Sequence, residues 1–174
     1  TRLQKNSDPE RWRDLLDRIA AANADGLQIT GQVRGRPTSV LLGFELSLHP
    51  FLDCVAWQDL APLDMAARLP ILRHPDFRAD MIAEAKNDST RARQLRDWDR
   101  IFPFGDPPQY EPDPSASIGT TARRRNVDPA GLAYDLMLEN DGQGILYLPM
   151  TNYAGGDMAP VHDMLCHPNT LIGL

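Results

Sequence analysis

The stretch that decides the fold is LQITGQV, residues 27–33, in which apolar and polar side chains alternate and β-branched residues recur. This pattern predicts a β-strand. Ahead of it, Ser7-Asp8-Pro9-Glu10 supplies an N-cap and an early proline for a helix that ends near Gly26. The apolar stripe of this helix recurs at steps of three and four residues and consists of Trp12, Leu15, Leu16, Ile19 and Ala22. Helix, short turn and strand form half of an α/β repeat.

The alternation of predicted helix and strand returns in the last third of the chain. Asp128-Pro129 begins a second helix that Asn140-Asp141-Gly142 ends. Residues 144–150, GILYLPM, form a short apolar run bounded by turn signals, which predicts a buried strand. Asp157 caps one more helix, and residues 170–174 are a final strand candidate.

The middle of the chain differs because prolines interrupt it. Most of the 15 prolines fall between residues 34 and 126, so only short helices and ordered turns are expected there. Residues 40–48 and 63–72 have helical apolar spacing, whereas residues 98–102 could be a strand. The small core predicted for this segment consists of Phe44, Leu48, Phe51, Trp57, Leu60 and Phe77. We therefore divide the chain into residues 1–36, a helical insertion over residues 37–126, and residues 127–174.

Composition excludes several classes of function. A net charge of −6 repels nucleic acid and anionic membrane surfaces, and the run Arg123-Arg124-Arg125 is interpreted as a solvated helix face. No apolar run is long enough to span a membrane, and no export signal is visible. The two cysteines form neither a disulfide framework nor a metal knuckle, and both are expected to be inert packing residues. These features fit a soluble protein of the cytoplasm.

Motifs of catalysis are missing from the chain. The four histidines form no HxH or HExxH pattern, and no nucleophile elbow, P-loop or dinucleotide fingerprint occurs. We therefore predict no catalytic residue and no metal ligand within these 174 residues.

Two segments are candidates for ligand contact. Gln32, Arg34 and Arg36 follow one another at i, i+2 spacing and would point the same way if the strand continued. A guanidinium at the carboxyl end of such a strand suits a carboxylate, although two ordinary surface arginines beside a turn are the simpler interpretation. Asn152 and Tyr153 open a polar stretch directly after GILYLPM, which is either a lining loop or the approach to a helix.

Five longer segments carry a family resemblance. They are GQVRGRPTSVLLGFELSLHPF, WDRIFPFGDPPQYEPDP, DPAGLAYDLMLENDG, LYLPMTNYAGGDM and MLCHPNTLIGL. In this order they resemble the D-aminoacylase branch of the metal-dependent amidohydrolases, the N-acyl-D-amino-acid deacylases. The resemblance implies part of a (β/α)₈ barrel, with residues 27–33 as about its seventh strand, residues 170–174 as its eighth, and a largely helical insertion over the active site.

The resemblance also implies that this chain holds only some of the residues that the enzyme needs. The parent enzyme would use zinc to hydrolyse the amide bond of a small acylated D-amino acid. Its zinc ligands and general base would lie outside this chain, so that Thr1 and Leu174 look like cuts and no zinc is bound here. The chain would supply the lid and the substrate contacts Gln32, Arg34, Arg36, Asn152 and Tyr153. Arg36-Pro37 matches an Arg-Pro pair that the family carries after this strand.

Two alternatives stay open at this point. The chain is either a piece of such an enzyme, inactive alone, or a non-catalytic helical binding module derived from the insertion. A strand taken from a barrel exposes unpaired backbone groups. We therefore expect the chain either to form a homodimer through residues 27–33 or 170–174, or to pack these two strands side by side.

Overall fold

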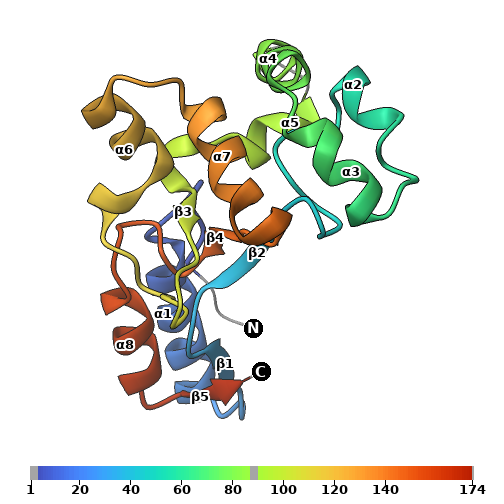
Figure 1. The fold of residues 1–174 in the computed structure, drawn as a ribbon. Helices are drawn as coiled ribbons and strands as arrows, with labels where there is room; N and C mark the ends of the chain where they lie inside the picture. The colour runs from blue at the N-terminus through green and yellow to red at the C-terminus, as the bar shows by residue number, and fades with distance from the viewer. Residues whose placement is uncertain (1–3, 87–89, 174) are drawn as a thin grey trace. The chain divides into compact units, whose positions relative to one another are not determined.

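The computed structural model describes residues 4–86 and 90–173 and divides them into two compact units (Figure 1). Unit 1 contains residues 4–39, 110–112 and 149–173, and unit 2 contains the described parts of residues 40–109 and 113–148. The helix predicted after Asp128 therefore belongs to the helical unit, although the sequence grouped it with the flanking segments. The chain passes between the units within two of its strands.

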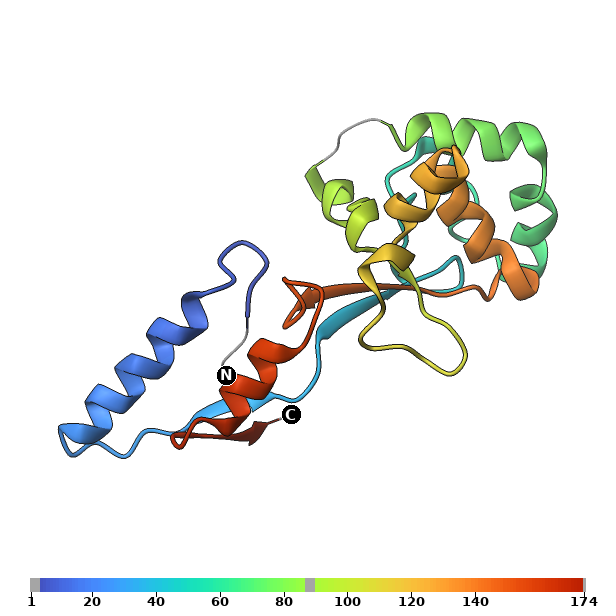
Figure 2. The same cartoon turned by 90° about the vertical axis from the view of Figure 1, so that its left-hand side faces the viewer.

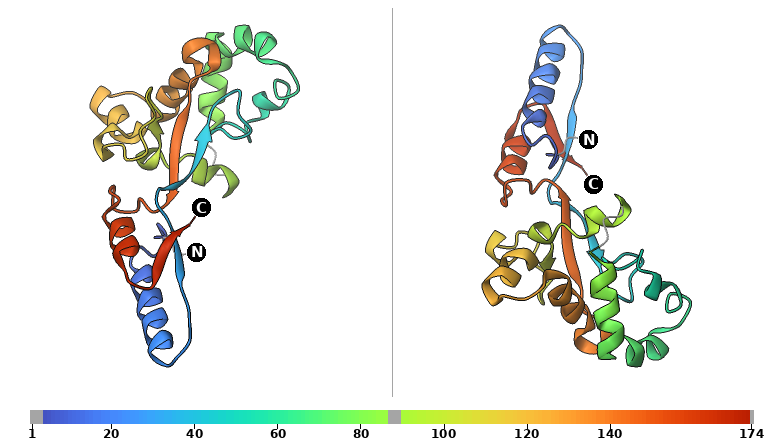
Figure 3. Two further views of the ribbon diagram at one scale, coloured as in Figure 1. Left: turned by 90° about the horizontal axis from the view of Figure 1, so that it is seen from below. Right: turned by 90° about the horizontal axis from the view of Figure 1, so that it is seen from above.

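Unit 1 is built on a pair of parallel strands. Strand β1 (Gly31–Arg34) pairs with β5 (Thr170–Gly173), with Gly31 opposite Thr170 and Arg34 opposite Gly173. Helices α1 (Arg11–Ala24) and α8 (Ala159–Cys166) belong to the same unit, and Figure 3 shows β5 alongside β1 with both helices next to the pair. Of the two alternatives expected, the structure shows the two strands side by side, but the strand predicted over residues 27–33 covers only Gly31–Arg34. The last residue of the second strand candidate, Leu174, lies outside the described residues.

One apolar cluster holds unit 1 together. It consists of Trp12, Leu16, Val33, Val161 and Met164, each 4% exposed or less, with Met158 and Leu165 packed against it. Helix α1 begins at Arg11 with Glu10 as its N-cap, and no side-chain oxygen caps it. The N-cap predicted at Ser7 is therefore wrong, because Ser7 lies in a turn that the Asp8 amide closes by donating to the Lys5 carbonyl at 3.2 Å.

Unit 2 consists of short helices around a small sheet (Figure 2). The helices are α2 (Val55–Gln58), α3 (Met65–Leu72), α4 (Pro75–Glu84), α5 (Thr90–Leu95), α6 (Ile118–Arg125) and α7 (Pro129–Gly142), with 3₁₀ turns η1 (Trp98–Arg100) and η2 (Pro114–Ala116). Strands β2 (Thr38–Leu42), β4 (Leu146–Thr151) and β3 (Phe102–Pro103) lie in that order, and β3 is antiparallel to β4. Helix α7 contacts α3, α4 and α6.

Two expectations for the middle of the chain are wrong. Residues 40–48 do not form a helix, because Val40 to Leu42 belong to β2 and a turn at Gly43 follows, in which the Gly43 amide donates to the Leu48 carbonyl. A Cβ at Gly43 would lie 3.0 Å from the Gly144 carbonyl oxygen, so the close approach of two chain segments requires glycine there. Residues 98–102 are mainly the 3₁₀ turn η1, and the strand β3 begins only at Phe102.

The described strands form these two small sheets and do not close into a barrel, so the fold is mixed α/β and rich in helix. Along residues 4–86 and 90–173, no helix combines the length and apolarity needed to cross a bilayer.

The centre of unit 2 is an aromatic cluster around His49. The imidazole is fully buried, its ring centroid lies 4.1 Å from that of Trp57, and Phe44 and Phe51 pack beside it. Its Nδ1 accepts a hydrogen bond from the Phe51 amide at 3.2 Å. Burial above all, and then the charge of Arg68, lower the pKa of His49 to about 3 against the opposing effect of Asp53. The ring is therefore neutral in the folded chain at neutral pH.

This buried ring predicts a loss of stability in acid. The unfolded chain takes up a proton near the ordinary histidine pKa of about 6.5, whereas the folded chain resists it down to about pH 3. The contribution of His49 to the free energy of unfolding is therefore complete above pH 6.5 and falls as the pH is lowered, by about 2 kcal/mol at pH 5. Urea unfolding between pH 8 and pH 5 measures this slope.

The variant His49→Phe should lose that part of the slope, because it keeps an aromatic ring but cannot be protonated. His74→Gln is the matched control, since the His74 side chain is 61% exposed. A slope that stays unchanged in His49→Phe would contradict the assignment.

Candidate functional site

Asn152, one of the predicted ligand contacts, lies at the centre of a hydrogen-bond network in unit 1. Its side chain is fully buried, and its Nδ2 donates to the carbonyl oxygens of Arg34 and Arg36, both at 3.3 Å. Its Oδ1 accepts from the Gln4 amide at 2.8 Å, and its own amide donates to the Gln4 carbonyl at 2.8 Å. The two predicted segments are therefore brought together, with residues 34–36 held against residue 152.

The backbone of Asn152 explains why this residue type occurs here. Its φ of 63° lies in the left-handed region, which asparagine tolerates better than most other residues with a side chain. The amide is engaged at both ends with the backbone, so Asn152 positions residues 34–36 in this structure. A contact of its side chain with substrate stays a prediction.

Tyr153 also positions a backbone segment through a hydrogen bond of its side chain. It is 3% exposed, and its hydroxyl donates to the Pro112 carbonyl oxygen. This contact fixes residues 110–112, the part of the proline-rich loop that belongs to unit 1. At the same loop, Tyr110 lies under the Arg36 guanidinium, with 5.8 Å between the Arg36 Cζ and the ring centroid.

The remaining predicted contacts, Gln32, Arg34 and Arg36, lie at and beyond the carboxyl end of β1. Gln32 is exposed and Arg34 half-buried, and both face away from the buried Val33, as alternation along a strand requires. Strand β1 ends at Arg34, so Arg36 lies on the following turn and does not continue the alternation. A Cβ at Gly173 would come within 2.9 Å of the Gln32 Cβ, so glycine in β5 leaves room for the Gln32 side chain.

Arg34 carries unused hydrogen-bonding capacity. Its Nη1 donates to the Thr38 hydroxyl at 3.0 Å, whereas its Nε is buried without a hydrogen-bond partner among the described residues. Exposed Arg36 adds a second guanidinium two residues away. Two guanidinium groups close together in sequence at a strand end are side chains of the kind that binds a carboxylate.

The sequence did not identify Gln4 or residues 110–112 as parts of this site. Gln4 is 3% exposed, and its Oε1 accepts from the Ala154 amide at 3.0 Å. No local pattern marks a glutamine before a helix as a partner of a residue near the other end of the chain. The prolines around residues 110–112 predicted an ordered loop, which was the signal that the sequence offered. The contact between Tyr110 and Arg36 is visible only in the structure.

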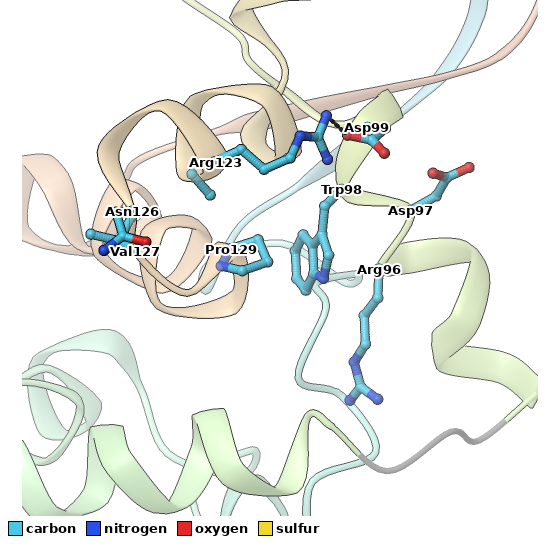
Figure 4. A pocket seen from close by; sticks show the side chains of 10 residues that line it. Arg96, Asp97, Trp98, Asp99, Arg123, Asn126, Val127 and Pro129 are labelled. Atoms are coloured by element: carbon cyan, nitrogen blue, oxygen red, sulfur yellow. Dashed lines mark hydrogen bonds and ion pairs between the residues drawn. The ribbon is translucent and has the colours of Figure 1, made fainter.

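A separate hollow of about 440 Å³ lies in unit 2 (Figure 4). Its wall includes Trp98, Pro129 and Asn126, together with the charged side chains Arg96, Asp97, Asp99 and Arg123. Arg123 reaches Asp99, with 2.7 Å between Nη2 and Oδ1, and Arg96 is directed away from Asp97 toward the Pro50 carbonyl. The sequence singled out none of these side chains as ligand contacts.

Asp97 is the titratable group of this hollow with a perturbed pKa. Burial raises the pKa of its carboxyl, Arg100 opposes the change, and Asp99 adds to it.

Metal-ligating side chains do not gather in threes anywhere in the described ranges. The two cysteines differ sharply from each other. Cys54 is 2% exposed, and burial raises the pKa of its thiol to about 11, as expected for an inert packing residue. Cys166 is exposed at the end of α8, so the expectation that it packs in apolar surroundings is wrong.

Comparison of the chain with known protein families, curated proteins and solved structures found no match.

The hydrogen bonds of Asn152 predict that replacing its side-chain nitrogen by oxygen strongly lowers the stability of the fold. Asn152→Asp keeps the acceptor for the Gln4 amide but replaces the two donated hydrogen bonds by a buried charge facing two carbonyl oxygens. The free energy of unfolding should fall by roughly 2–4 kcal/mol. Asn126→Asp is the matched control, because Asn126 is exposed and also left-handed, with φ of 53°. Its cost should stay below about 1 kcal/mol in urea unfolding. Equal losses in both variants would show that backbone conformation, and not the hydrogen bonds, is the cause.

Proposed function

We propose that this chain is part of a zinc-dependent amidohydrolase that hydrolyses N-acyl-D-amino acids, and that Arg34 and Arg36 bind the substrate carboxylate. The observation that carries the proposal is the parallel pair β1 and β5, with α8 packed on one face and both arginines at and beyond the carboxyl end of β1. In β/α barrels, ligands bind at that end of the strands. The five segments that resemble the deacylases give the reaction class.

The exposed strand edges agree with membership of a larger sheet. Each strand of the pair has one strand neighbour among the described residues, and Leu171 and Ile172 of β5 are 47% and 70% exposed. Parallel sheets are otherwise almost always covered on both faces and extended over several strands. Further strands of a barrel would cover them, and a second copy of the chain is the other occupant to consider.

The chain's own residues would recognise and cover the substrate. The guanidinium of Arg34 would donate to one carboxylate oxygen, and Arg36 would add a second positive charge. Asn152 would hold both backbone carbonyls so that the guanidinium groups keep their spacing. The helical unit would act as a lid that excludes water.

The catalytic zinc does not fit the residues described here. A catalytic zinc site needs about three protein ligands, and no three such side chains converge within residues 4–86 and 90–173. Zinc would supply the polarisation of the acyl carbonyl from elsewhere in the parent protein. No step of the chemistry is assigned to this chain.

The alternative is a non-catalytic helical binding module. Unit 2 supports it, because this unit has its own aromatic core around His49 and a hollow of about 440 Å³ beside Trp98. Such a module would bind a partner without hydrolysing anything. Activity of the protein expressed from its whole reading frame decides between the two.

The arginines give the sharper prediction. In the whole protein, Arg34→Gln and Arg36→Gln should each lower kcat/KM for N-acetyl-D-amino acids roughly 10- to 100-fold, mainly through KM, because a charge-assisted hydrogen bond to the carboxylate is lost. On a substrate whose carboxylate is replaced by a carboxamide, both variants should act like the wild-type protein. Steady-state kinetics with both substrates measures the difference.

Arg18→Gln is the matched control, since Arg18 is an exposed arginine on α1 of the same unit. It should leave both kinetic constants unchanged. A wild-type protein without deacylase activity would contradict the enzyme proposal, and equal losses on both substrates would contradict the role given to the arginines.

A further inference from the structure

The outer face of α8 carries an imidazole and a thiol side by side. Val161 and Met164 of this helix are buried in the core of unit 1, so His162 and Cys166 lie on the opposite, exposed face. The two residues are four positions apart, which places them one helical turn from each other on one side of the helix. Cys166 Sγ lies 3.6 Å from His162 Nε2.

This separation matches the bite of a tetrahedral zinc ion. Zinc binds thiolate sulfur at about 2.3 Å and imidazole nitrogen at about 2.0–2.1 Å, so that a tetrahedral angle places the two ligand atoms about 3.5–3.6 Å apart. The observed 3.6 Å therefore already has the required spacing. Thiolate and imidazole together favour zinc over magnesium or calcium, which prefer oxygen ligands.

The second ring nitrogen of His162 faces a carboxylate. His162 Nδ1 lies 3.7 Å from Asp163 Oδ1, and the other oxygen of Asp163 lies 3.9 Å from Arg13 Nη2 on α1. At 3.7 Å the carboxylate is too far from Nδ1 for a hydrogen bond, but its negative charge lies next to the His162–Cys166 pair and attracts a cation.

We propose that His162 and Cys166 form a two-residue binding site for a zinc ion on the surface of α8, with water molecules as the remaining ligands. Binding forms the S–Zn and N–Zn bonds and releases the thiol proton to solvent, with no change in oxidation state. The site is independent of the proposed deacylase activity, because it uses none of the residues assigned to substrate. It differs from the sequence-based expectation that no histidine and cysteine form a cluster and that this chain binds no zinc.

The experiment is a zinc titration of the reduced protein, followed by calorimetry. Wild-type protein should bind one zinc per chain, and Cys166→Ser and His162→Gln should each weaken binding at least tenfold. Both positions are exposed, so these variants are expected to fold. His74→Gln, which removes the exposed histidine that is the N-cap of α4 in unit 2, should change the affinity less than twofold.

Alkylation of the thiols provides a second readout. Zinc should slow the reaction of Cys166 with iodoacetamide in wild-type protein, and His162→Gln should abolish this protection. Cys54 serves as an internal reference, because it is 2% exposed and should react slowly throughout. Mass spectrometry of the digested chain reports both sites. Equal zinc affinity in wild type and Cys166→Ser, or protection that survives His162→Gln, would overturn the proposal.

Discussion

The geometry of the candidate site depends on the side-chain amide of Asn152. A turn at the end of a strand leaves carbonyl groups without strand partners, and buried carbonyls must find donors. Asn152 supplies two donors from one nitrogen and so fixes Arg34 and Arg36 together. The same residue binds Gln4 through both its side chain and its backbone, which ties the start of the chain to the same point. One buried amide therefore fixes the backbone that carries two cations.

The sequence predicted the elements whose signals are local. Local signals predicted the helix after Asp128 and strands over residues 144–150, 27–33 and 170–174. The structure has these strands at Leu146–Thr151, Gly31–Arg34 and Thr170–Gly173. The Asp128 carboxylate accepts from the Ala130 amide, as an N-cap should. The sequence-based predictions were wrong where contacts with distant parts of the chain determine the local secondary structure. Residues 40–42 have helical spacing, yet they form a strand because β4 lies beside them, and no pattern within residues 40–48 reports that partner.

At the candidate site, too, the sequence indicated what depends on local signals and missed what depends on distant contacts. Alternation along β1 places Gln32 and Arg34 correctly on the face opposite Val33, because a strand has a fixed period of two. The role of Asn152 could not be read from the sequence, since its partners are Gln4 and two carbonyls more than a hundred positions away. Pairings at such separation depend on how the chain closes. The sequence marked the polar residues after β4 as a candidate for ligand contact. Only the structure shows that Asn152 holds the backbone of residues 34–36.

Histidine and cysteine show how surroundings decide chemistry. His49 and Cys54 lie near each other in sequence, and burial suppresses the charged form of both, with the pKa of His49 lowered and that of Cys54 raised. Neither can act as an accessible ligand. His162 and Cys166 have the same side chains, but the apolar stripe of α8 turns Val161 and Met164 inward and leaves them exposed one turn apart. The difference lies in helix phase, because the residues that fill the core determine which polar atoms meet on the surface. A histidine and a cysteine four residues apart on the polar side of an amphipathic helix therefore meet on its surface, and the amino-acid pattern itself indicates this contact.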